Sequence, residues 1–214
     1  MNMRKLDSRP LQSFLRLLTA TCMLCLLTAC AGSPAPSGQE KTVTLLLLPS
    51  TLGMELSMMQ RMRVRLDAFP DAPSPDLEVA LEADSSSVRL AILQLSHTVA
   101  RLAWDGVRID QHLAPGWPKV VRAERVLSDL QMVWWPLAAI QDGLAAGWTV
   151  RESVGKREFV HGEKVVTTVK ITSERTIDLI QAGEGYRVFI TTDGEVPQYG
   201  GGEPSKTVES ERQQ

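Results

Sequence analysis

The sequence predicts a mainly β (α+β) domain, a single curved antiparallel sheet or half-barrel with a short helical lid. Roughly nine or ten short segments alternate apolar and polar residues, and tight turns separate most of them. One segment, 122–146, has helical spacing instead. A single helical segment is too little for a repeated strand–helix–strand pattern, so we expect the strands to pair as an antiparallel meander.

The first half of the domain contains the clearest strand, 60–69, in which Met62, Val64 and Leu66 alternate with charged residues. Strands are also expected at 77–82, 88–95, 98–104 and 107–113. Asp105 and Gly106 are the strongest hairpin signal, and we expect them to be the central residues of a type I′ turn, both with φ > 0.

The helical segment carries its apolar residues at i, i+4, i+7, i+8 and i+11, namely Val126, Leu130, Val133, Trp134 and Leu137. Pro136 either ends or kinks this helix near Trp135, or opens a second helix. Strands are then expected at 148–153, 156–161, 164–173, 176–182 and 186–192. The helix is expected to pack against the apolar face of the strands, including Met62, Val64 and Leu66.

Residues 1–29 predict a signal peptide. A basic leader precedes the charge-free, leucine-rich run 17–29, which would reach only about 20 Å as a helix, short of a bilayer core of about 30 Å. The run ends Leu27-Thr28-Ala29-Cys30, which resembles a bacterial lipobox. The resemblance implies cleavage before Cys30 and lipid attachment to it, with acyl chains such as palmitate. The alternative is an ordinary secretory signal that happens to end at a cysteine.

The rest of the chain divides into three further parts. Residues 30–41 comprise the lipidated Cys30 and a flexible tether rich in Pro, Ser and Gly, 42–193 form the β half-barrel domain, and 194–214 form a disordered tail. Ala31 stands where an aspartate typically retains lipoproteins in the inner membrane. We therefore expect a lipid-anchored protein of the cell outer membrane that faces the periplasm.

Composition and motifs exclude several function classes. The net charge is −2, and loss of residues 1–29 makes the chain more acidic, which argues against nucleic acid as a partner. The three cysteines all lie in the first thirty residues. Catalytic and nucleotide-binding motifs are missing, so we predict no enzyme activity, catalytic residue, cofactor or metal site. The histidines, expected as surface or hydrogen-bonded residues near strand ends, are His97, His112 and His161.

Two groups of side chains are candidates for binding. Arg61, Arg63 and Arg65 share one strand face and form either a site for anionic headgroups or, as we favour, an ordinary solvated face. The tryptophans either belong to a filled core or line a cavity between lid and sheet. The candidate ligand cavity consists of Met62, Val64, Leu66, Leu130, Val133, Trp134, Trp135 and Trp148.

A strand-rich body with a helical lid behind a lipobox resembles the LolA/LolB-like lipoprotein carrier fold. The run 127–136, together with Trp104-Asp105-Gly106 and the segments 77–79 and 185–188, resembles an uncharacterised family of Gram-negative lipoproteins. That family is often encoded with aryl-polyene pigment biosynthesis genes, and the resemblance spans roughly residues 45 to 192. It implies no catalytic residues and a cavity of the kind in which the carriers hold acyl groups.

These observations predict an outer-membrane-anchored lipoprotein that binds an amphipathic lipid, or an acyl or polyene chain, for transfer or retention in the envelope. The alternative is a non-enzymatic adaptor lipoprotein with a filled core, which docks an envelope or pigment-biosynthesis partner. A periplasmic esterase or acyltransferase is the least favoured class. The expected partners are the membrane, through the N-terminal anchor, the amphipathic ligand and an envelope protein, and the chain is expected to be a monomer.

Overall fold

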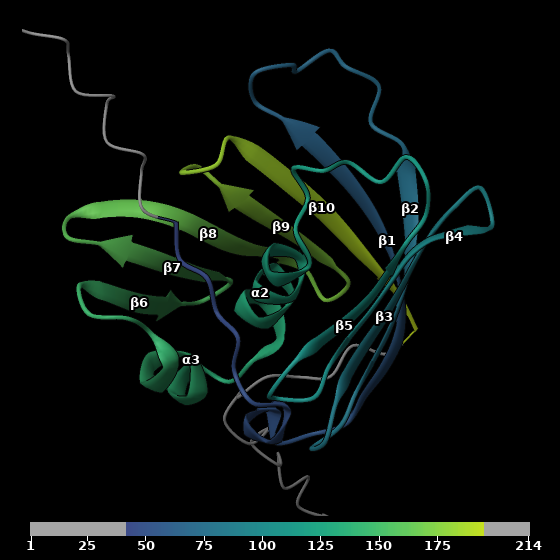
Figure 1. Ribbon diagram of the computed structural model, residues 1–214. Helices are drawn as coiled ribbons and strands as arrows, with labels where there is room; N and C mark the ends of the chain where they lie inside the picture. Colours follow the sequence, from purple (N-terminus) through teal and green to yellow (C-terminus); the bar gives the residue numbers. More distant parts are fainter. Residues whose placement is uncertain (1–41, 195–214) are drawn as a thin grey trace, which may run out of the picture. The chain divides into compact units, whose positions relative to one another are not determined.

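The computed structural model describes residues 42–194. This part of the chain forms one ten-stranded antiparallel sheet with two α-helices, which confirms the predicted mainly β class and the single antiparallel sheet (Figure 1). The elements are η1 (Pro49–Leu52), β1 (Leu56–Leu66), β2 (Asp76–Ala83), β3 (Val88–Gln94), β4 (His97–Trp104), β5 (Ile109–Leu113), α2 (Ala123–Trp134), α3 (Leu137–Gly143), β6 (Trp148–Ser153), β7 (Lys156–His161), β8 (Lys164–Ser173), β9 (Thr176–Gln181) and β10 (Tyr186–Asp193).

The sheet consists of two five-stranded meanders that are joined where β1 pairs with β10. Its order is β5-β4-β3-β2-β1-β10-β9-β8-β7-β6, so β5 and β6 are the two edge strands although they follow one another in the chain. The connection between them, which carries α2 and α3, must therefore pass from one edge of the sheet to the other. Figure 1 shows α2 inside the curve of the sheet along this path.

Strand β1 shows how the sequence pattern sets the inner face of the sheet. Leu56, Met58 and Gln60 are buried and alternate with exposed residues, as the period of two in a strand requires. The strand begins four residues before the predicted 60–69 and ends three residues earlier. Its inner face continues through Met62, whose cross-strand partners are Leu77 and Ile190.

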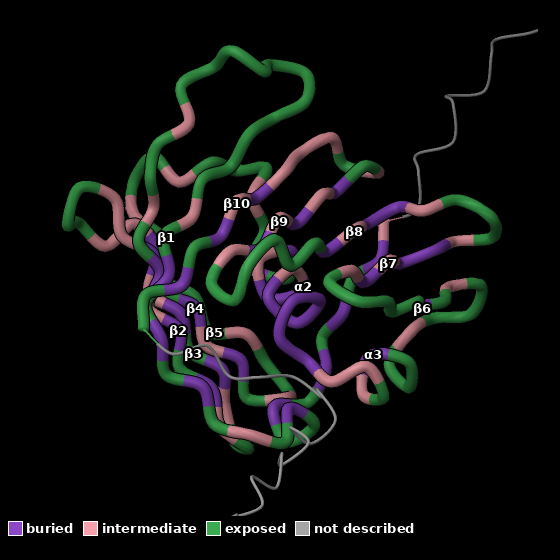
Figure 2. The backbone as a smooth tube through the Cα atoms, turned by 180° about the vertical axis from the view of Figure 1, so that it is seen from behind, coloured by how far each residue is buried: buried purple, intermediate pink, exposed green. Residues whose placement is uncertain are grey.

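Pro136 separates the two helices. Helix α2 ends at Trp134, and the next residue is extended, as expected for a residue before proline. Pro136 then precedes the first residue of α3, so both alternatives that the sequence left open are realised at once. Most residues of α2 are buried, including Arg125, Ser128 and Gln131, so it is the central element of the core, and Figure 2 shows its backbone as largely buried.

Residues 43–47 form an extended segment outside the sheet, which we call the strap. Sequence analysis assigned no element to it. Val43, Leu45 and Leu47 are buried, whereas Thr44 and Leu46 are exposed. In Figure 1 the strap runs beside α2. It approaches α3 so closely that a Cβ on Gly143 would lie 2.1 Å from a methyl carbon of Leu47.

The turn predicted at Asp105-Gly106 has a different geometry. The hairpin between β4 and β5 exists, but its loop covers 105–108, because Trp104 pairs with Ile109. Gly106 has φ of +90°, whereas Asp105 is not in the positive-φ region, so the type I′ prediction is wrong. The Asp105 carboxylate instead accepts hydrogen bonds from the backbone N–H groups of Val107 and Arg108, both 2.8 Å.

A two-residue turn with φ > 0 at both positions lies between β3 and β4. Leu95 has φ of +49° and Ser96 has φ of +63°, and the flanking residues Gln94 and His97 pair directly. This is the backbone pattern of a type I′ turn, which normally prefers Asn-Gly. The sequence gives no such signal here, and the turn therefore carries backbone strain.

We predict that the double substitution Leu95→Asn with Ser96→Gly raises the free energy of unfolding by about 1 kcal/mol. Leu95 is 87% exposed, so little buried surface is lost. Urea unfolding checks the change. Val107→Asn is the control, because Val107 is equally exposed but has ordinary backbone, and it should change stability by less than about 0.5 kcal/mol. A loss of stability in the double variant would contradict the assignment of a strained type I′ turn to Leu95 and Ser96.

Candidate functional site

A cavity of about 320 Å³ lies between the inner face of the sheet and α2. This volume is at the lower end of the range of small-molecule sites, about 300–1,000 Å³. Most of its surface is apolar, and strands β1, β2, β3, β9 and β10 all contribute. Its lining consists of Met62, Val64, Leu66, Leu77, Val79, Leu90, Ile92, Trp117, Val120, Val121, Arg125, Val126, Asp129, Leu130, Val133, Trp134, Leu179, Glu184, Tyr186, Val188 and Ile190.

Most of the predicted cavity residues lie at this site. They are Met62, Val64 and Leu66 from β1 and Leu130, Val133 and Trp134 from α2. Trp135 and Trp148 lie elsewhere. Trp135 is fully buried and donates from its indole N–H to Thr51 Oγ1 at 3.0 Å, and Trp148 packs against His161 with ring centroids 4.9 Å apart.

The cavity has an exposed mouth and a buried inner end. Leu66 at the end of β1 is 47% exposed and Val120 is 88% exposed. At the other end, Val79 is 2% exposed and Trp134 is 1% exposed. Helix α2 runs along this gradient, with Val126 and Asp129 in its first turns and Val133 and Trp134 in its last. An elongated apolar molecule can therefore enter with one end first and leave its other end at the mouth.

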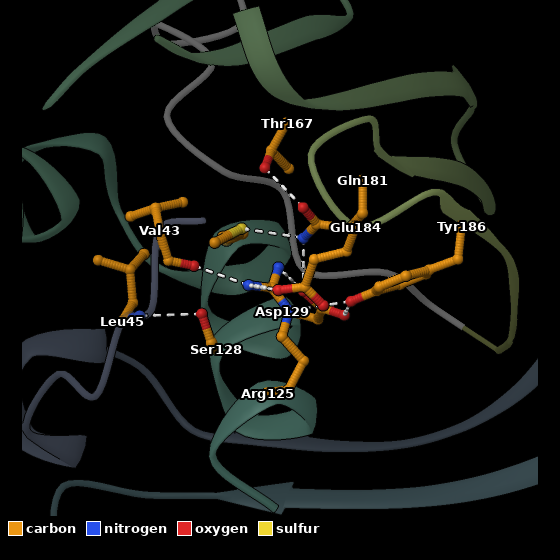
Figure 3. A network of polar contacts seen from close by, with 10 residues as sticks. Val43, Leu45, Arg125, Ser128, Asp129, Thr167, Gln181, Glu184 and Tyr186 are labelled. Atoms are coloured by element: carbon orange, nitrogen blue, oxygen red, sulfur yellow. Dashed lines mark hydrogen bonds and ion pairs between the residues drawn. The ribbon is translucent and has the colours of Figure 1, made fainter. Parts of the chain in front are cut away.

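Four polar residues gather at the mouth end: Arg125 and Asp129 from α2, Glu184 from the turn before β10, and Tyr186 at the start of β10 (Figure 3). Arg125 is only 6% exposed. Its guanidinium contacts Asp129 Oδ1 at 2.6 Å and Glu184 Oε1 at 3.1 Å. It also donates from Nε to the Tyr186 hydroxyl at 2.9 Å. We call these four residues the polar cluster.

The Asp129 carboxylate is at the centre of the polar cluster. It accepts hydrogen bonds from Arg125, from the Tyr186 hydroxyl and from the side-chain amide of Gln181, the last at 2.6 Å. Thr167 in turn donates to the Gln181 carbonyl oxygen at 2.6 Å, which fixes the orientation of that amide (Figure 3). Every polar side chain in this buried region is therefore held by a neighbour.

Burial affects the ionisation of this cluster strongly. Desolvation raises the pKa of the Asp129 carboxyl above its usual value, against the opposing effects of Arg125 and the hydrogen bonds. Burial and the neighbouring carboxylate likewise raise the pKa of Tyr186. Desolvation opposes the charge of Arg125, but Asp129, Tyr186 and Glu184 outweigh it and raise the pKa of the guanidinium. Tyr186 therefore stays a neutral phenol and Arg125 stays charged at physiological pH.

Three polar side chains of α2 bind the strap. Ser128 Oγ accepts from the backbone N–H of Leu45 at 2.9 Å. The Gln131 side chain accepts from the N–H of Leu47 at 2.8 Å and donates to its carbonyl oxygen at 3.0 Å. Arg125 donates to the carbonyl oxygen of Val43 at 2.7 Å. The strap therefore bonds its backbone groups mainly to side chains of α2 rather than to the backbone of a neighbouring strand.

Arg157 of β7 fixes the C-terminal end of α2. Its guanidinium is buried and donates to the carbonyl oxygens of Met132 at 3.0 Å and Trp135 at 2.9 Å. A cation at this end is favourable because the last carbonyl groups of a helix have no partner within it. Helix α2 is therefore held by polar contacts at both ends.

The other candidate residues lie away from the cavity. The three β1 arginines are engaged on the outer face: Arg61 with Asp193 at 3.8 Å, Arg63 with Asp76 at 2.8 Å, and Arg65 over the Phe189 ring at 5.6 Å. His97 begins β4, His112 lies in β5 and His161 ends β7. Among residues 42–194, no group of three or more His, Cys, Asp or Glu side chains is placed to hold a metal ion.

The polar cluster and its contacts were missed by sequence analysis. A usable signal was present in α2, where Arg125, Ser128 and Gln131 recur at helical spacing and would place polar groups on a side of the helix that nothing else explains. Cys30 and the tail from 195 onward lie outside the described residues. Within residues 42–194, no helix has the length and apolar character needed to cross a membrane.

We predict that Gln131→Leu lowers the free energy of unfolding by about 1–3 kcal/mol, because it leaves the buried N–H of Leu47 without its acceptor. Urea unfolding measures the loss, and hydrogen exchange should speed up at the Leu45 and Leu47 amides. Gln141→Leu on the exposed side of α3 is the matched control and should have little effect. Equal effects of the two substitutions would show that the strap contacts of Gln131 contribute nothing to the free energy of unfolding.

Comparison with known protein families gives a match over most of the described residues. The model of a family described as a protein of unknown function, DUF3261, matches residues 57–194. This range begins at the second residue of β1 and ends just after β10, so it includes all of the sheet except Leu56, and both α-helices, but not the strap. A search of curated proteins finds no match. The chain belongs to the DUF3261 family.

Proposed function

We propose that this protein binds the apolar chain of an amphipathic lipid in the cavity between the sheet and α2. The observation that carries the proposal is the cavity itself, which is lined by apolar side chains over most of its surface and has a polar cluster at its mouth. If each carbon group of a ligand chain takes about 30 Å³, the volume of a water molecule in the liquid, then 320 Å³ has room for roughly ten such groups. This suits an acyl or polyene chain that enters end first.

The proposal places this activity at the outer membrane, on a lipoprotein anchored through Cys30 and facing the periplasm. It is supported by the lipobox pattern and by the sheet that surrounds a helix, the arrangement expected of a LolA/LolB-like carrier. Val43 lies thirteen positions after Cys30, so the tether reaches at most about 45 Å. The cavity would therefore stay close to the membrane, where lipid can be received, retained or passed on.

The cavity favours ligand binding over the adaptor alternative. An adaptor would need a core filled by its own side chains and an outer surface for its partner. The apolar lining of the cavity favours binding instead, because such a surface gains from contact with an apolar chain rather than with water.

We predict that Val126→Trp lowers the amount of co-purifying lipid several-fold, because the larger side chain occupies the cavity without placing a charge in it. Purification of the native lipoprotein, lipid extraction and mass spectrometry measure the lipid per mole of protein. Val154→Trp, at a fully exposed turn, is the matched control and should keep the wild-type amount. Leu130→Glu should also lose lipid, with a stability cost that urea unfolding measures separately. Lipid-free wild-type protein that binds no added amphiphile would contradict the proposal and favour the adaptor.

We also predict that Cys30→Ala abolishes incorporation of a palmitate analogue and yields an uncleaved or soluble precursor. Cys22→Ala is the control and should leave labelling unchanged, because Cys22 would leave with the signal peptide. Metabolic labelling followed by fractionation of the membranes checks both variants. Retained labelling in Cys30→Ala would rule out Cys30 as the attachment site.

A further inference from the structure

We propose that the cavity selects amphiphiles whose polar end is a hydrogen-bond donor, a hydroxyl, amide or ammonium group, and rejects those that end in a carboxylate or phosphate. This inference rests on the proposed function and specifies its ligand class. It is based on the charges and hydrogen bonds of the polar cluster at the mouth, where the polar end of a bound amphiphile must lie.

The cluster holds one positive and two negative side chains. Among the described residues that line the cavity, Arg125 is the one cation, and Asp129 and Glu184 are the anions. The nitrogens of Arg125 are already bonded: Nε to Tyr186, one terminal nitrogen to Val43 and Glu184, and the other to Asp129. These contacts use four of the five guanidinium N–H groups, and Arg125 is only 6% exposed, so an incoming anion would have to break some of them to pair with the guanidinium through both of its oxygens.

The most exposed charged group of the cluster is an acceptor, the Glu184 carboxylate. The Tyr186 hydroxyl donates its proton to Asp129 and accepts from Arg125 Nε, so it is already engaged in both directions. Glu184 contacts Arg125 through Oε1, and its second oxygen has no partner among residues 42–194. The Glu184 side chain is 26% exposed, so its free oxygen can meet a ligand at the mouth. A hydroxyl, amide or ammonium group satisfies such acceptors, whereas a second anion is repelled by them.

The buried end of the cavity gives no competing charged side chain or acceptor. Val79, Ile92 and Ile190 there are apolar and almost fully buried, and the indole of Trp134 is a donor only. A carboxylate placed among them would lose its hydration without compensation. The polar end of the ligand therefore lies at the polar cluster, and the charge of that cluster decides which ligands are accepted.

A matched series of ten-carbon amphiphiles tests this inference. Decanol, decylammonium and decanoate share one chain and differ in their polar ends. Displacement of N-phenylnaphthylamine from the delipidated full chain gives their relative affinities at about pH 7.5. Decanol and decylammonium should bind about tenfold more tightly than decanoate, since like charges are repelled at the mouth.

Glu184→Gln should reduce this discrimination at least about threefold, because it removes one anion and releases Arg125 from an ion pair. Glu163→Gln, the same change in the exposed turn between β7 and β8, is the control and should leave the discrimination unchanged. Decanoate binding as tightly as decanol would overturn the inference while leaving the proposed function standing. If none of the three displaces the fluorophore, the proposed function is wrong and the inference is wrong with it.

Discussion

Polar contacts that fix α2 inside the curve of the sheet are the constraint on which the rest of the structure depends. Arg125, Ser128 and Gln131 bind the backbone of the strap, and Arg157 binds the last carbonyl groups of the helix. These bonds have short, defined lengths, so the helix cannot move toward the sheet without leaving buried donors unpaired. The space between the helix and β1–β3 therefore persists as a cavity instead of closing by hydrophobic collapse.

The same constraint explains why the chain can bury an extended segment that belongs to no sheet. A buried strand normally satisfies its N–H and C=O groups with neighbouring strands. Here the amides of Leu45 and Leu47 find their acceptors on side chains of α2 instead, and the Trp104 indole donates to the carbonyl oxygen of Leu47 at 2.8 Å. These bonds explain why α2 carries buried Ser128 and Gln131 side chains. The strap in turn covers the core on that side of the helix.

Sequence periodicity could predict the sheet and most of the cavity, because both depend on local patterns. Alternation placed Met62, Val64 and Leu66 on one face, and helical spacing placed Leu130, Val133 and Trp134 opposite them.

Features that depend on tertiary contacts could not be predicted in this way. Trp135 follows the last residue of α2 in an extended conformation, and its indole bonds to Thr51, 84 positions earlier in the chain, instead of lining the cavity. The turn at Leu95 and Ser96 lacks the usual residues, and the strap depends on side chains 82 to 84 positions further along the chain.

The buried charged residues at the cavity mouth are not explained by their contribution to stability. Desolvation makes a buried ion pair a weak source of stability, and apolar residues of similar volume often serve a filled core as well or better. A chain that needed only a solid core would gain little from placing Arg125, Asp129 and Glu184 beside an apolar space. Once present, the cluster is costly to disturb, since loss of one partner leaves a buried charge uncompensated. We therefore propose that the cluster at the entrance to this apolar cavity serves to recognise a polar end attached to an apolar chain.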